Sequence, residues 1–329
     1  IIYEHLFFGI VPMLFQPQDQ RPAMYGCGIT YLSTPRQDGA PHGAALPFTT
    51  DEATRQVYSN QVAPAAAAAV EPLQALYDGI LAKFGIYGHK THFSNVATLL
   101  ADEFWQTTIP AFEYPQDAFS SNVTFVGAMP QVASTTPLPL WAEEVADFNR
   151  VVLVTQGTVA NEDFNALVKP TLAALADEKD TLVLVTAGGR DIADLSFDLP
   201  LNARIASYLP FDWLLPKIDL LITNGGYGTV NQALAAGVPI IVAGSTEDKP
   251  EVAARIAWSG VGINLETARP KEVMVRNAYR RIFADQAFRV RAREMAVQFK
   301  RLDSAAIIQE SLRSLAECNA VEMGKRKAG

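Results

Sequence analysis

The second half of the chain alternates short apolar runs with longer segments in which apolar residues recur at helical spacing. The runs at 151–155 (VVLVT) and 181–186 (TLVLVT) are apolar at nearly every position, which is typical of parallel strands covered on both faces. Further strands are predicted at 204–208, 219–223, 238–242 and 261–264, and helices at 164–175, 226–236 and 249–258. This alternation predicts an α/β fold with a doubly wound parallel sheet.

The first half has a weaker pattern. Strands are predicted at 24–32 and 123–126, and helices over about 50–85 and 93–105. The alanine run at 65–69 continues at helical spacing through Leu81, so it is expected to be helix, bent near Pro64 and Pro72. Two or three strands are too few for a complete Rossmann domain, and we therefore expect an incomplete one in this half.

Pro, Ser and Thr are concentrated at 129–140 (MPQVASTTPLPL), a composition that favours an extended linker over helix or sheet. A length of 329 residues also suits two domains better than one. We predict four segments: a partial N-terminal Rossmann-like domain at 1–135, a linker at 136–150, a C-terminal domain at 151–303, and a closing helix and tail at 304–329.

Charge, hydropathy and cysteine usage narrow the function classes. The formal net charge of −8 and the isoelectric point near 5.1 argue against a nucleic-acid partner, because phosphate backbones are held by clustered Lys and Arg. No run approaches the roughly 18 apolar residues that cross a bilayer, so we expect no transmembrane segment and a cytoplasmic location. The two cysteines and four histidines lack metal-ligand spacing, so no metal site is predicted.

The clearest chemical signal is the run 223–229 (TNGGYGT), which lies between a predicted strand and a predicted helix. Gly225, Gly226 and Gly228 let backbone N–H groups approach a ligand closely, and the start of a helix adds partial positive charge. Thr229 adds a hydroxyl donor, and Asn224 can donate through its amide. A diphosphate is therefore the natural ligand of this turn.

Two more predicted strands end in similar loops. Gly157 and Thr158 follow the strand at 151–155, and a Gly-Gly-Arg sequence ending at Arg190 follows the strand at 181–186. Loop glycines often serve only tight turns, and for each loop alone that interpretation stays open. Because ligands of open parallel sheets bind at the carboxyl ends of the strands, the loops together predict a single site.

The segment from 204 to 262 resembles the donor-binding part of the UDP-glycosyltransferase superfamily, whose members have the GT-B fold of two Rossmann-like domains facing across a cleft. The resemblance is to the bacterial macrolide and fungal sterol or secondary-metabolite branches, including the C-terminal domains of erythromycin-type enzymes, and extends loosely over 1–320. It implies that the loop at Gly157 and Thr158 takes part in donor binding and that Tyr208 and Leu209 contact the nucleotide base. It also implies that 224–229 binds the pyrophosphate, that Gln232 binds the ribose, and that Asp248 and Lys249 bind the donor sugar.

Each of these residues also has a simpler structural explanation, and the sequence matches the family with three departures. Asp248 alone is suited to cap a helix, and Lys249 to a solvated first turn. Asn224 stands where the family usually has His, Gln232 where it has Glu, and Lys249 where it has Gln. These departures imply either weaker phosphate binding or phosphate binding that relies more on Arg190, and a donor sugar that is acidic or differently substituted.

The resemblance implies a metal-independent, inverting transfer of a hexose from a UDP- or dTDP-sugar to a hydroxyl of a small apolar acceptor. The nucleotide sugar is a co-substrate, and no cofactor is expected. In the family a His in the first N-terminal loop is the general base, oriented by a carboxylate. No Gly-His-x-x-Pro-like motif occurs, and Glu4 falls near the place of the orienting carboxylate, so we expect it to partner a His not present here. His89 and His92 are alternative bases.

Two interpretations from different classes stay open. The first is a glycosyltransferase. The second is a non-catalytic nucleotide-sugar-binding or auxiliary protein that lacks the catalytic His loop. A sugar-nucleotide epimerase has a similar fold, but the sequence shows no set of carboxylates and a His placed to face a donor sugar.

Overall fold

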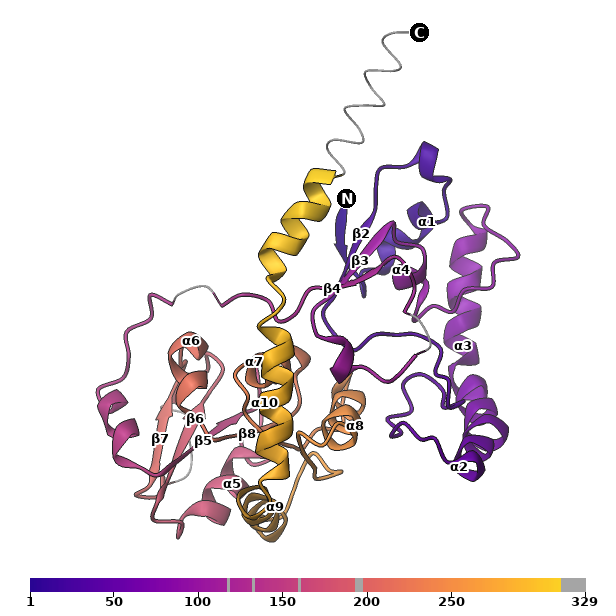
Figure 1. Ribbon diagram of the computed structural model, residues 1–329. Helices are drawn as coiled ribbons and strands as arrows, with labels where there is room; N and C mark the ends of the chain where they lie inside the picture. Colours follow the sequence, from indigo (N-terminus) through magenta and orange to yellow (C-terminus); the bar gives the residue numbers. More distant parts are fainter. Residues whose placement is uncertain (117–118, 132–133, 159–160, 193–197, 315–329) are drawn as a thin grey trace.

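Two parallel β-sheets, each packed with helices, organise the chain (Figure 1). The computed structural model describes residues 1–116, 119–131, 134–158, 161–192 and 198–314. Cys318 and the rest of the predicted tail beyond 314 lie outside these residues. No helix in the described ranges is long and apolar enough to cross a membrane. We call the part built on the first sheet the N-terminal unit and the part built on the second sheet the C-terminal unit.

The second sheet has six strands, all parallel, and is the doubly wound sheet that the sequence predicted. The strands are β5 (Arg150–Thr155), β6 (Thr181–Thr186), β7 (Ala203–Ala206), β8 (Leu220–Thr223), β9 (Ile240–Val242) and β10 (Gly262–Asn264). Their spatial order is β10-β9-β8-β5-β6-β7, so the winding reverses between β5 and β8. In such sheets the ligand crevice lies outside the carboxyl ends of the strands at this reversal.

Helices cover both faces of this sheet. They are α5 (Val168–Leu175), α6 (Phe211–Leu214), α7 (Tyr227–Ala235), α8 (Lys249–Trp258), α9 (Glu272–Ala284) and α10 (Ala287–Phe299), with a 3-10 turn at Leu215–Lys217. In β5, Val151 and Leu153 belong to one buried apolar cluster, while Val152 and Val154 belong to another. Successive strand residues face opposite sides, so a strand between two helix layers is apolar throughout, as the sequence showed.

The first sheet has four parallel strands, in the order β1-β2-β3-β4. They are β1 (Ile2–Glu4), β2 (Tyr25–Gly28), β3 (Glu103–Gln106) and β4 (Val123–Phe125). The helix predicted over 93–105 is wrong at its end, because only α4 (Val96–Leu99) is helical there and β3 follows. Phe104 and Trp105 are buried in different apolar clusters on the two faces of β3, a pattern too short to separate from helical spacing in the sequence.

A long helical segment follows the first loop of the N-terminal unit. It comprises α2 (Glu52–Val57), a π-helical turn (Tyr58–Val62) and α3 (Ala63–Ala82). Asp51 caps its start by accepting a hydrogen bond from the Thr54 N–H at 2.8 Å. The π turn lies just before Pro64, which cannot donate a backbone hydrogen bond to the preceding turn. The remaining short elements are α1 (Val11–Leu14) and 3-10 turns at Phe8–Ile10, Gln18–Gln20, Pro110–Phe112 and Ala142–Asp147.

The chain returns to the N-terminal unit at its end. Helical residues 304–314, beyond α10, run toward the first sheet (Figure 1). Ile307, Ile308 and Leu312 pack there against Tyr25 and Trp105. This closing helix therefore ties the two units together, while the domain limits taken from the sequence stay predictions.

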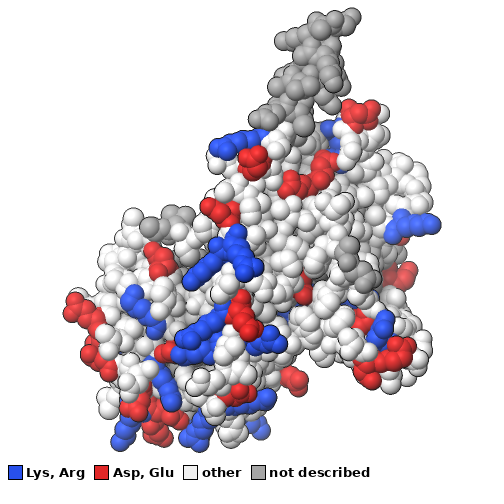
Figure 2. Space-filling model, in the orientation of Figure 1, with Lys and Arg blue, Asp and Glu red and all other residues white. Residues whose placement is uncertain are grey.

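Basic and acidic side chains are interspersed over the face shown in Figure 2. Arginines of α9 and α10 form ion pairs with nearby carboxylates. Arg280 lies 3.3 Å from Glu178, and Arg289 lies 2.6 Å from Asp219. Part of the basic charge of these helices is thus paired with acidic neighbours.

Candidate functional site

The loops that the sequence singled out leave the C-terminal sheet at the same edge, on either side of the winding reversal. Thr155 of β5 pairs in register with Thr223 of β8, so the loops after them are adjacent. The Asn224 side-chain amide donates to the carbonyl of Gln156 at 2.6 Å. The 156–158 loop and the glycine turn therefore form one continuous surface at the point where such sheets bind ligands.

The glycine turn has a backbone shape that only glycine accommodates. Gly225 has φ +96°, and a Cβ on it would lie 2.8 Å from Cγ2 of Val242. Gly226 is the N-cap of α7, and no side chain caps that helix start. The first N–H groups of α7 are thus left for a ligand, and their partial positive charge suits an anion.

The loop after β6 touches the same surface. A Cβ on Gly188 would lie 2.1 Å from the carbonyl oxygen of Gly157, so the two loops are in direct contact. The Arg190 guanidinium donates to the carbonyl of Asn161 at 2.7 Å and lies over the ring of Phe164. Arg190 is therefore held at the rim of the predicted site, and its contact with a phosphate stays a prediction.

Tyr208 and Leu209 follow β7 at the end of this edge. Tyr208 is 49% exposed, which leaves its ring available for stacking on a base. Leu209 is fully buried in the core, so only its main chain can contact a ligand. Along α7, Gly228 is exposed and Thr229 and Gln232 are half-buried on the first turns of the helix.

Asp248 and Lys249 stand at the start of α8. Asp248 is the N-cap residue, but its side chain makes no capping bond and instead accepts the Thr30 hydroxyl at 2.5 Å. The simple capping role is therefore not what the structure shows. Lys249 is buried and paired with Glu247, and a Cβ on Gly244 would lie 3.0 Å from that of Lys249. Asp248 thus faces the N-terminal unit, while Lys249 packs beside the glycine turn.

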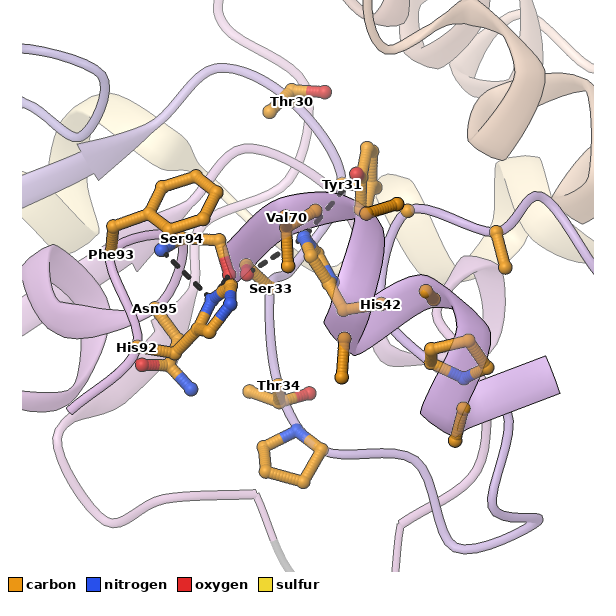
Figure 3. A pocket seen from close by; sticks show the side chains of 18 of the residues that line it. Thr30, Tyr31, Ser33, Thr34, His42, Val70, His92, Phe93, Ser94 and Asn95 are labelled. Carbon is orange, nitrogen blue, oxygen red and sulfur yellow. Dashed lines mark hydrogen bonds between the residues drawn. The ribbon is translucent and has the colours of Figure 1, made fainter. Parts of the chain in front are cut away.

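A cavity of about 590 Å³ lies in the N-terminal unit next to this segment (Figure 3). One wall is formed by alanines of the first half of α3 together with Val70. Phe8 and Phe93 add further apolar surface. Thr30, the partner of Asp248, also lines the cavity. The apolar space and the predicted donor-sugar segment are therefore joined through one residue.

Two of the histidines that line the cavity each lie beside a hydroxyl group (Figure 3). Nε2 of His42 lies 2.9 Å from the Ser33 hydroxyl and 3.3 Å from that of Tyr31. Nδ1 of His92 lies 2.7 Å from the Ser94 hydroxyl. Burial lowers the pKa of His42 to about 4 and also lowers the pKa of His92, so both rings are neutral near pH 7.

Glu4 lies at the carboxyl end of β1, beside the cavity. Its carboxylate accepts the Leu6 N–H at 2.7 Å and lies 3.1 Å from Nδ1 of His5, which lines the cavity. Nδ1 of His5 is also 3.2 Å from the carbonyl of Cys27. Of the two alternative bases, His92 lines the cavity, whereas His89 packs against other rings outside the lining. The described residues contain no group of three metal-ligating side chains.

Sequence reasoning missed the contacts that connect the two units. Tyr227, the first residue of α7, donates its hydroxyl to Glu113 at 3.1 Å and accepts from the Gln106 amide at 2.8 Å. In the sequence Tyr227 is only an interruption in a glycine turn. The cavity wall at Tyr31 and His42 was also missed, because the loop that carries it has no periodicity.

Comparisons with known proteins show what this chain is similar to. Residues 169–310 match the family described as "Erythromycin biosynthesis protein CIII-like, C-terminal domain". The chain is 33% identical over 326 residues to UDP-glycosyltransferase 2 of Phaeomoniella chlamydospora, covering 96% of this chain and 71% of that protein. It is 44% identical over 200 residues to 4'-demethylrebeccamycin synthase of Lentzea aerocolonigenes, covering 60% of this chain and 46% of that protein.

A solved structure with the same fold is that of CalG4, the calicheamicin glycosyltransferase. It superimposes with a TM-score of 0.67 at 23% identity, over 96% of this chain and 75% of that one. This likeness confirms the GT-B fold. The fungal relative, at 33% identity over 96% of the chain, shows that the chain belongs to the UDP-glycosyltransferase family, and the family match at 169–310 fits the branch of bacterial macrolide and fungal enzymes.

Proposed function

We propose that this protein moves a hexose from a UDP- or dTDP-sugar to a hydroxyl of a small apolar acceptor. The observation that carries the proposal is the hydrogen bond between Thr30 and Asp248, because it joins the apolar cavity to the donor edge of the C-terminal sheet. An acceptor in the cavity and a sugar at Asp248 would then meet at this point. The family relation favours this function over that of a non-catalytic binding protein.

The donor would lie along the sheet edge. Tyr208 would stack on the base, Gln232 would hold the ribose, and Asp248 and Lys249 would bind the sugar hydroxyls. The uncapped start of α7, after Gly225, would take the diphosphate. Its N–H groups would also stabilise the charge that the departing nucleoside diphosphate gains, so this chemistry needs no metal ion.

The transfer would be a direct displacement. The acceptor hydroxyl gives its proton to a general base, its oxygen attacks the anomeric carbon, and the bond from that carbon to the diphosphate oxygen breaks. Attack from the side opposite the leaving group inverts the anomeric centre. The sequence pairs Glu4 with a His not present here, but in the structure its carboxylate lies 3.1 Å from Nδ1 of His5 beside the cavity. We propose that Glu4 orients an imidazole base, and that His5 is the imidazole it acts on in this chain. We propose a cytoplasmic location for the reaction.

The test is a transfer assay with the full chain. UDP-glucose and dTDP-glucose are each incubated with umbelliferone, a small apolar phenol, and the products are separated by chromatography. The proposal predicts an umbelliferyl glycoside of inverted configuration and release of the nucleoside diphosphate. Binding of the nucleotide sugar with no glycoside from any of a panel of apolar phenols and alcohols would instead support the non-catalytic alternative.

A further inference from the structure

A buried ion cluster lies where the two units meet, outside the donor edge. We call Arg255, Glu113 and Glu251 the interdomain cluster. Arg255, on α8, donates through Nε to Glu113 of the N-terminal unit at 2.9 Å, and through Nη1 to Glu251 at 2.6 Å. All three side chains are at most 5% exposed. Burial alone would lower the pKa of Arg255, but the two carboxylates raise it above its ordinary value, so the guanidinium stays charged.

The carboxylates of this cluster hold the loop that forms the cavity wall. The second oxygen of Glu113 accepts the Leu32 N–H at 3.0 Å, and that of Glu251 accepts the Ala45 N–H at 2.8 Å. Leu32 and Ala45 bracket the stretch that contains Ser33 and His42. The loop has no regular secondary structure, and these two bonds hold its ends, one from Glu113 of the N-terminal unit and the other from Glu251 of α8.

The guanidinium of Arg255 reaches the cavity wall through an aromatic ring. It lies 4.7 Å from the ring centroid of Tyr31 and 4.2 Å from that of Tyr114. The hydroxyl of Tyr31 lies 3.3 Å from Nε2 of His42, and both residues line the cavity (Figure 3). A continuous set of contacts thus runs from Arg255 through Tyr31 to His42.

We propose that Arg255 is a positioning residue for the acceptor: it holds Tyr31 and the 32–45 loop so that His42 and Ser33 present a fixed polar position in the mainly apolar cavity. The inference rests on the proposed function and names the acceptor more closely. The acceptor is an apolar molecule with a hydrogen-bonding group, a hydroxyl or carbonyl, that meets the His42–Ser33 pair while a second hydroxyl receives the sugar.

Two features separate this role from general stability. A buried ion pair is weak evidence for stability, because desolvation offsets much of the attraction between its charges, but it fixes geometry when every polar atom has a partner. The donor edge, in contrast, is built from the ends of β5 and β8 and the start of α7, and none of its predicted residues bonds to Arg255. One bond links the cluster to that edge, because Glu113 accepts the Tyr227 hydroxyl at the start of α7. A change that removes the charges of the cluster and keeps this bond should therefore affect the acceptor and spare the nucleotide.

The test uses variants that keep the fold. Arg255→Met alone would leave two buried carboxylates unpaired, so it is combined with Glu113→Gln and Glu251→Gln. The new amide oxygens can still accept the Leu32 and Ala45 N–H groups, and that of Glu113→Gln can also keep the Tyr227 hydroxyl bond at the start of α7. The control is Arg289→Met with Asp219→Asn, an ion pair at 2.6 Å before the amino end of β8, whereas the glycine turn follows the carboxyl end of that strand. Both are compared with the unchanged chain for thermal unfolding, UDP affinity and transfer from UDP-glucose to umbelliferone.

The proposal predicts that the triple variant raises the KM for umbelliferone about tenfold and increases hydrolysis of UDP-glucose relative to transfer, with UDP affinity within about twofold of the unchanged chain. The control should change neither the KM for umbelliferone nor the ratio of UDP-glucose hydrolysis to transfer. The inference would be overturned if the triple variant weakened UDP binding by the same factor as it raised the KM for umbelliferone. It would also be overturned if the triple variant behaved like the control. If the unchanged chain neither binds UDP nor transfers glucose, the proposed function itself fails.

Discussion

Thr30, which lines the apolar cavity, donates its hydroxyl hydrogen to the carboxylate of Asp248 at 2.5 Å. The two residues are separated by 218 positions in sequence and belong to different units. Their contact defines where an acceptor hydroxyl and a donor sugar would meet. It also means that the Asp248 carboxylate is oriented from the N-terminal unit and not by its own helix.

Replacing Thr30 with Val removes this hydrogen bond while preserving the shape of the side chain. A hydrogen bond to a charged group contributes about 1.5–3 kcal/mol, so we expect the transfer rate from UDP-glucose to fall roughly tenfold or more. UDP affinity should not change, because the diphosphate turn does not involve Thr30. Steady-state kinetics and UDP calorimetry measure both quantities. If UDP affinity fell by the same factor as the transfer rate, Thr30 would not act at the meeting point of acceptor and donor sugar alone.

Replacing Gly225 with Ala should abolish nucleotide binding. The new Cβ would meet Val242 at 2.8 Å in a left-handed backbone conformation, which displaces the N–H groups at the start of α7. Gly79→Ala in α3 is the control, because a Cβ there meets nothing within 4 Å and favours the helix. Calorimetry with UDP measures both variants, and full binding by Gly225→Ala would show that the turn is not the phosphate site.

The pKa of His42 predicts a pH dependence of stability. Burial lowers this pKa to about 4 from the ordinary value of 6.5. Between these values the unfolded chain binds more protons, so stability rises with pH from about 4 to 6.5 and is lost as the pH falls. His42→Gln should flatten the curve by at most about 3 kcal/mol. Urea unfolding across this interval measures it, and a His42 titration by NMR near 6.5 would refute the assignment.

Glu4→Gln tests the proposed orienting carboxylate without an activity assay. Burial lowers the pKa of His5, and the charge of Glu4 opposes that effect. Removing the charge should therefore lower the pKa of His5 further, while the amide oxygen keeps the bond to the Leu6 N–H. NMR titration of His5 reads this directly. An unchanged His5 pKa would mean that the carboxylate does not act on the imidazole, and Glu52→Gln, on α2, is the control.

The C-terminal sheet was predictable because its strands are buried on both faces. Such a strand is apolar at nearly every position, as in the run 151–155, and the loops are predicted where the apolar runs end. The strand β3 was not predictable in this way, since Phe104 and Trp105 face opposite clusters within only four residues. So short a run fits a helix as well as a strand.

The donor edge was predicted from glycines and helix starts, whereas the acceptor side was not. Tyr31 and His42 lie in a loop without periodicity, and their positions depend on contacts with residues that are far away in the sequence. Arg255 and Glu113, for example, are 142 residues apart. No local sequence pattern encodes such a pair. The cavity wall could therefore not be predicted from the sequence, because it depends on contacts between the two units.

The central claim, that the edge at Gly225 and Asp248 binds a nucleotide sugar, is tested most directly by calorimetry. UDP, dTDP and UDP-glucose are titrated into the full chain and into Asp248→Ala. We predict that a nucleoside diphosphate binds both proteins equally, and that UDP-glucose binds Asp248→Ala more weakly by about tenfold, because only the sugar contacts Asp248. If neither UDP nor dTDP binds the unchanged chain, the donor site assigned to this edge is wrong.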